Sequence, residues 1–174
     1  MKTWSDIVGR WNAAAAALAG SSGAALPSDV RDELFALQND VLEGLFDTPN
    51  ADAGALRFVL DALIALSLAE PDDPSHPWAR GGVLARVGRH LEAADDFLLA
   101  ARLFDLEAAA GDGLTGDEGD WAQTARAHAA RSLALGGQPV AAVYLLRTLS
   151  GEERDAVAPA VEASLGELQR LAAG

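Results

Sequence analysis

Residues 123–149 read QTARAHAARSLALGGQPVAAVYLLRTL. Alanine and leucine dominate on both sides of Gly136-Gly137, and both residues have high helix propensity. Glycine supplies a tight turn between helices because it adopts backbone conformations that other residues avoid. The stretch therefore predicts two helices, over 120–135 and 138–149, joined as an antiparallel hairpin.

The composition of the whole chain extends this prediction. Its 174 residues include 38 Ala and 26 Leu, and half of all residues are hydrophobic. Valine, isoleucine and threonine are sparse between turn signals, which argues against a β-sandwich or a parallel sheet. The length suits a single domain able to bury a core. We therefore expect one all-α domain over residues 1–174.

Turn and capping signals divide the chain into about eight helices. Three prolines, at 71, 74 and 77, mark the clearest break, and Ser150 with Glu153 forms a capping box that opens the last segment. Pro159 is expected to kink or split that segment. The other expected helices cover 3–19, 28–46, 51–69, 77–87 and 90–110.

Two of the expected hairpins share one spacing of small and apolar residues. The first set is Gly81, Leu84, Gly88, Ala93, Phe97 and Ala100. The second set is Ala130, Leu133, Gly137, Ala142, Leu146 and Leu149. Small residues let two helix backbones approach where they cross, and the larger residues fill the groove beside the crossing.

This pattern resembles the tetratricopeptide repeat (TPR), a helix-turn-helix unit of 34 residues. The resemblance covers 75–107 and 123–150, and an insertion near 106–120 separates the two hairpins. Leu146 and Leu149 depart from the aromatic residue and the alanine usual in the family. The resemblance implies a right-handed stack of antiparallel hairpins, preceded by helices over 1–69 and capped by 151–174. A generic α-helical bundle is the alternative.

The resemblance also implies a function in protein interaction. Position matching places Trp78, Arg86, His128 and Arg131 on the inner face of the two hairpins. Arginine can form paired hydrogen bonds with a carboxylate, and tryptophan can anchor an apolar side chain. We therefore expect a partner-binding groove for a protein, a peptide or a second copy of the chain. Trp78 and Gly82 occupy two positions of the family's clamp for a C-terminal carboxylate, so that ligand is not expected.

The charge of the chain narrows the choice of partners. The formal net charge is −13, and such a polyanion repels nucleic acid and acidic lipid. Residues 29–74 carry 11 acidic and two basic residues, and 105–125 carry six acidic and no basic residues. No nucleic acid or membrane partner is expected. Two interpretations of the acidic residues stay open: they form a face that steers a basic partner, or they only keep the surface solvated.

Motifs for catalysis are missing from the sequence. There is no cysteine, no G-x-S-x-G and no Gly-Lys-Ser/Thr, so the common nucleophile and phosphate-loop routes do not apply. The G-x-G-x-x-G at 111–116 lies in an acidic loop, 111–120, after a helix rather than a strand, and the loop lacks calcium-site spacing. His76 near Asp72 and Asp73 is a weak metal or acid–base pattern. We expect no enzyme, no cofactor and no metal.

Two further expectations concern location and an alternative function. Polar residues interrupt the apolar stretch near the N-terminus, which favours a first helix over a signal peptide, and no run reaches the 18 apolar residues of a membrane span. A cytoplasmic protein is expected. The main expectation is a non-catalytic, TPR-like interaction or scaffold module, and the alternative is a small-ligand-binding or regulatory helical domain.

Overall fold

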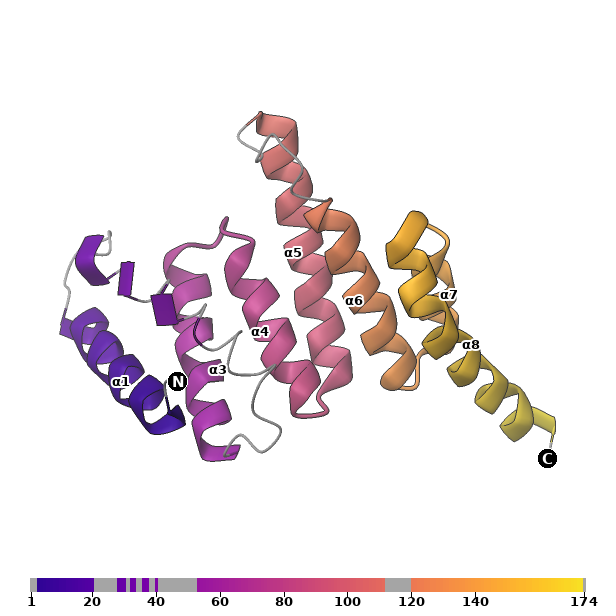
Figure 1. Ribbon diagram of the computed structural model, residues 1–174, viewed down its shortest axis with the longest axis horizontal. Helices are drawn as coiled ribbons and strands as arrows, with labels where there is room; N and C mark the ends of the chain where they lie inside the picture. Colours follow the sequence, from indigo (N-terminus) through magenta and orange to yellow (C-terminus); the bar gives the residue numbers. More distant parts are fainter. Residues whose placement is uncertain are drawn as a thin grey trace. The chain divides into compact units, whose positions relative to one another are not determined.

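The computed structural model describes residues 3–20, 53–111 and 120–173, together with residues 28–30, 32, 33, 36, 37 and 40. In these residues every regular element is an α-helix, so the protein is all-α as the composition predicts. The helices are α1 (Trp4–Gly20), α3 (Ala53–Ala69), α4 (Ser75–Arg86), α5 (His90–Ala110), α6 (Trp121–Leu135), α7 (Pro139–Leu146) and α8 (Gly151–Ala173) (Figure 1). The described residues between 28 and 40 are helical, and the rest of the helix expected over 28–46 lies outside the description.

Helix α4 begins two residues earlier than predicted, and its first turn contains a proline. Pro77 fits there because the first four N–H groups of a helix have no partner within it, so the missing N–H costs nothing. Asp73 accepts hydrogen bonds from the backbone N–H of Ser75 at 2.8 Å and from the Ser75 hydroxyl at 2.6 Å. The three prolines therefore shape the start of this helix rather than prevent it.

Helix α8 is a single helix that continues through Pro159, so the chain is not split there, and a kink at this residue stays a prediction. Val157 and Val161 lie one turn apart on either side of the proline, and both are buried in the core. Pro159 itself is exposed. Burial of the two valines holds the helix in place, which offsets the loss of one backbone hydrogen bond at the proline.

The chain divides into two compact units, residues 1–87 and 88–174. In the first unit, α3 packs against both α1 and α4. The largest fully buried side chains of this unit are Trp11, Leu37, Val59, Leu63, Leu66 and Val83. Arg10 of α1 pairs with Glu33 at 2.7 Å and with Asp40, and these ion pairs connect α1 to the helical residues at 28–40.

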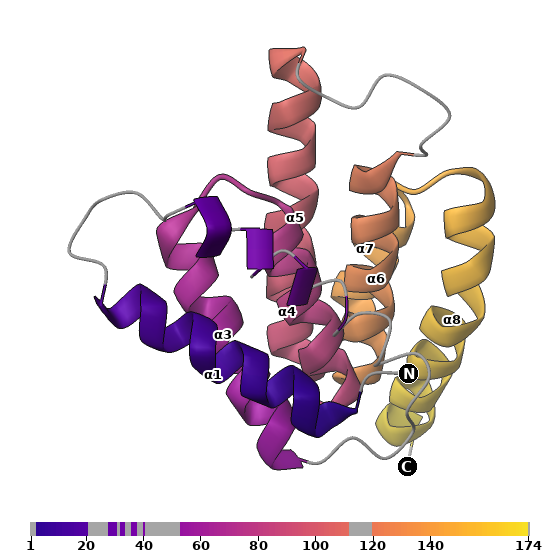
Figure 2. The same ribbon diagram turned by 60° about the vertical axis from the view of Figure 1, so that its left-hand side comes forward.

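In the second unit, α6 packs against α5, α7 and α8 (Figures 1 and 2). A helix with three neighbours needs small side chains on several faces, because each neighbour must come close. Alanine meets this need. The buried residues of α6 are Ala122, Ala125, Ala127, Ala129, Ala130, Ser132 and Ala134.

The turn between α6 and α7 confirms the expected role of glycine. Gly137 has a φ of +77°, the backbone N–H of Gln138 donates to the carbonyl of Leu133, and the N–H of Gly137 donates to that of Ala134. This pair of hydrogen bonds is the Schellman arrangement that ends many helices. Ala130 of α6 and Ala142 of α7 are completely buried in one core cluster, in agreement with small residues at the crossing.

The second repeat is thus a helical hairpin inside one unit. The first, over 75–107, spans the two units, which meet in the chain at Gly88, so TPR-like stacking stays a prediction. Helix α5 continues to Ala110 with its last six residues exposed, and residues 112–119 of the acidic insertion lie outside the description. In the described part of the chain, no helix has both the length and the apolar character needed to cross a bilayer.

Candidate functional site

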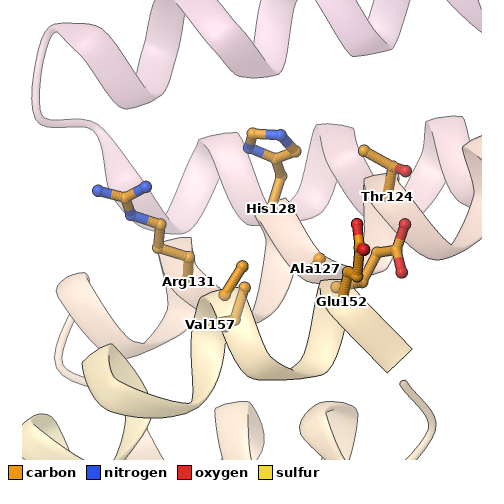
Figure 3. A pocket seen from close by; sticks show the side chains of 8 residues that line it. Thr124, Ala127, His128, Arg131, Glu152 and Val157 are labelled. Atoms are coloured by element: carbon orange, nitrogen blue, oxygen red, sulfur yellow. The ribbon is translucent and has the colours of Figure 1, made fainter. Parts of the chain in front are cut away.

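A cleft of about 260 Å³ lies between α6 and the first turns of α8. Its α6 wall consists of residues spaced three or four apart, which places them on one face of the helix. The α8 wall repeats this spacing. The lining residues are Thr124, Ala127, His128 and Arg131 from α6, and Glu152, Glu153, Ala156 and Val157 from α8 (Figure 3).

The charged groups of the cleft are separated along its length. Figure 3 shows the guanidinium of Arg131 at one end and the carboxylate of Glu152 at the other, beside Thr124. Ala127 and Val157 provide an apolar floor between these ends. Among the described residues, no ion pair engages the guanidinium of Arg131. The cleft therefore offers one cationic end, one anionic end and an apolar middle.

Three local interactions fix the two helices that form the cleft. Asp120 caps α6, because its carboxylate accepts the N–H of Gln123 at 3.0 Å. At the other end of α6, the hydroxyl of Ser164 in α8 donates to the carbonyl of Ala134 at 2.8 Å. Between these points Val157 is buried in the core that both helices share. Asp120 thus caps the first turn of α6, while Ser164 and Val157 hold α8 against it.

His128 lies at the centre of the α6 wall. Its ring packs against Phe97 of α5, with 5.2 Å between the ring centroids. Partial desolvation lowers the pKa of His128 below its usual value, and the nearby charge of Arg131 lowers it further. Because the residue as a whole is exposed, solvent screens part of this effect. The neutral imidazole is therefore favoured at pH 7, and Arg131 carries the positive charge of this end.

The structure brings together two of the four residues expected to bind a partner. His128 and Arg131 lie three residues apart on α6 and line the same cleft. Trp78 is half-buried and Arg86 is exposed, and both belong to α4 in the first unit. A groove common to all four residues stays a prediction.

The acidic wall of the cleft was missed in the sequence. Glu152 and Glu153 were considered only as part of a capping box at the start of α8. The signal that was present is the short hairpin before α8: because α7 returns along α6, the next helix can begin beside the N-terminal half of α6 and run parallel to it. That inference requires the packing of α8 on α6, which the sequence pattern does not specify.

A second group of polar side chains lies where α3 ends and α4 begins. Nε2 of His76 is 3.2 Å from a carboxylate oxygen of Glu70 and 3.8 Å from one of Asp73. The His76 side chain is 3% exposed, and the two carboxylates are 23% and 27% exposed. The weak pattern in the sequence paired His76 with Asp72 and Asp73. In the structure Glu70 takes the place of Asp72, which is exposed.

The acidic loop at 111–120 gives no structural information on a ligand. Asp120 caps α6 and Gly111 ends α5, while the residues between them lie outside the description.

Comparison with known proteins gives no family for this chain: no family model, no curated protein and no solved structure matches it.

Proposed function

We propose that the protein is a non-catalytic interaction module that binds a segment of a partner protein in the cleft between α6 and α8. The observation that supports this most is the coexistence of an arginine, an apolar floor and two glutamates in one small cleft. A peptide can satisfy all three with successive side chains. The TPR resemblance, which predicts that His128 and Arg131 face a partner, agrees with this site.

The size of the cleft favours a peptide side chain over a small-molecule ligand. Sites for small molecules and cofactors commonly measure about 300–1,000 Å³ and bury most of the ligand. The cleft measures about 260 Å³ and is lined by four ionisable side chains. It can hold one or two side chains of a segment whose backbone stays outside. A small-ligand-binding or regulatory domain remains the alternative proposal.

The arrangement of charges specifies the bound segment. An acidic side chain near Arg131 would form a charge-assisted hydrogen bond, and a basic side chain would fit near Glu152 and Glu153. A short apolar side chain between them would cover Ala127 and Val157. The proposed ligand is therefore a segment with an acidic, an apolar and a basic residue in series, from another protein or from a second copy of this chain.

An affinity experiment tests the proposed site. The full chain is used to capture proteins from a native lysate, and peptides from the captured proteins are then titrated against it. Replacing Arg131 by Ala should weaken the best peptide at least about tenfold, since it removes a charged hydrogen bond of about 1.5–3 kcal/mol. Glu152→Ala should weaken it through the opposite end.

Arg170→Ala is the matched control, because Arg170 is exposed on α8 and does not line the cleft. It should bind as the unaltered chain does. If Arg131→Ala and Glu152→Ala also bind normally, the cleft is not the interaction site. Light scattering of the free protein distinguishes capture of a partner from self-association.

A further inference from the structure

We propose that Glu70, Asp73 and His76 form a binding site for one divalent first-row transition metal ion, with Zn²⁺ as the ion to test. This site is independent of the proposed peptide cleft, because its residues belong to the first unit of the chain. It combines one imidazole nitrogen with two carboxylates, and the ligand atoms of the three residues all lie within 4.8 Å of one another.

The distances between the ligand atoms suit a common metal ion. Zinc bonds of about 2.1 Å to nitrogen and oxygen place neighbouring ligand atoms roughly 3.0–3.4 Å apart. The separation of 3.2 Å between Nε2 of His76 and the Glu70 oxygen falls in this range, and the 3.8 Å to the Asp73 oxygen exceeds it slightly.

The local backbone holds the three residues in position before any ion binds. One oxygen of Asp73 accepts two hydrogen bonds from Ser75, so the other is directed toward His76. The backbone N–H of Asp73 donates to the carbonyl of Glu70 at 3.3 Å, which closes the turn between α3 and α4. Pro71 and Pro74 reduce the freedom of the same turn in the unfolded chain. Little order would be lost on binding.

The chemistry of the three side chains decides the class of ion. Two carboxylates carry two negative charges and a neutral imidazole carries none, so a dication balances the group. A set of one nitrogen and two oxygens suits Zn²⁺, Mn²⁺ or Fe²⁺, whereas Mg²⁺ and Ca²⁺ prefer oxygen alone. The carboxylates are partly exposed, so water can fill the remaining coordination positions.

The same geometry also suits polar contacts between His76 and the two carboxylates without a metal. The two interpretations differ in a measurable way. A metal site takes up one equivalent of Zn²⁺ per chain. A purely internal ion pair takes up none.

Isothermal titration of the untagged full chain with ZnCl₂ tests the proposal. One Zn²⁺ should bind per chain, and MgCl₂ at the same concentrations should give no binding. Glu70→Gln and His76→Gln should each weaken Zn²⁺ binding by about tenfold or more. Co²⁺ should give a visible absorption spectrum that excess Zn²⁺ abolishes.

Asp72→Asn is the matched control, because it removes the same charge from the same loop at an exposed residue outside the group. It should leave the affinity within about twofold of the unaltered chain. Circular dichroism checks the folding of each variant, and if His76→Gln unfolds, the partly exposed Glu70 decides the question. Absence of one-to-one binding, or equal weakening by Asp72→Asn and Glu70→Gln, would overturn the proposal.

Discussion

At Gly88 the backbone φ is +80°, in the left-handed region that only glycine adopts freely. A Cβ added there would meet no atom within 4 Å, so any cost of substitution comes from the backbone alone. Gly88→Val should lower the free energy of unfolding by about 1–2 kcal/mol. Urea denaturation followed by circular dichroism measures the change.

Gly88→Asn provides the comparison, because asparagine tolerates the left-handed conformation better than other residues do. It should cost clearly less than valine. An equal loss for both variants, or no loss for Gly88→Val, would contradict a strained turn at this position.

The pKa of His128 leads to a second prediction, about the pH dependence of stability. Its pKa in the folded protein is lowered, first by desolvation and then by Arg131, so the folded state resists protonation. As the pH falls through about 6.5, the usual value for histidine, the unfolded chain takes up a proton more readily than the folded one. The contribution of His128 to stability is therefore present at high pH and is lost as the pH falls.

Titration of the imidazole by NMR measures this pKa directly. It should lie below the usual value of about 6.5, and Arg131→Gln should raise it part of the way back. The unaltered chain should also lose more unfolding free energy than His128→Gln between pH 7.5 and pH 5. A pKa at or above the usual value would contradict the surroundings described for His128.

Single residues also show what the sequence could and could not predict about the sites. His128 and Arg131 are predicted by position matching to the TPR pattern, which uses only residue spacing within one hairpin. Glu152 and Glu70 were not assigned to a site, because each meets its neighbours only after two helices pack or a turn closes. The sequence pattern pairs His76 with Asp72 and Asp73 because all three lie in the same proline-rich break.

At the scale of elements, the crossing of α6 and α7 depends on side-chain volume. Ala142 is completely buried, and its neighbour Ala141 on the same helix is exposed. Ala142→Leu should lower the free energy of unfolding by about 1–3 kcal/mol, because added methyl groups find no space in a packed core. Thermal or urea denaturation of the purified protein measures this loss.

Ala141→Leu is the control, because it adds the same atoms to the same helix on its exposed side. It should change the free energy of unfolding by less than about 0.5 kcal/mol. If the two variants lose equal stability, the effect belongs to the helix itself and not to its crossing with α6.

Helix boundaries were largely predictable, and the exceptions have a physical cause. Glycine turns, capping residues and proline act within a few residues, so the ends of α5 and α6 fall within one residue of the prediction. The course of α8 through Pro159 depends instead on Val157 and Val161, whose burial against distant helices outweighs the local signal. Local sequence signals do not include tertiary packing, and tertiary packing determines the course of this helix.

At the scale of the whole molecule, the helices group into two compact units, residues 1–87 and 88–174, and the single domain expected from the sequence stays a prediction. Grouping of helices follows from contacts between residues far apart in the chain, and composition does not encode these. The two acidic stretches, residues 29–74 and 105–125, are also partly neutralised by ion pairs. Glu33 and Asp40 pair with Arg10, and Asp105 pairs with Arg126, so part of each block is neutralised within its own unit.

The many alanines of α6 make this helix suitable for following ligand binding and core packing by NMR. An alanine methyl group has no side-chain torsion to average its NMR signal, so its chemical shift depends directly on the atoms around it. Ala127 lines the cleft and also belongs to the core cluster, while Ala130 and Ala134 belong to that cluster and do not line the cleft. Carbon-13 labelling of alanine methyl groups would therefore report occupancy of the cleft and repacking of the core in one spectrum, without a single introduced probe.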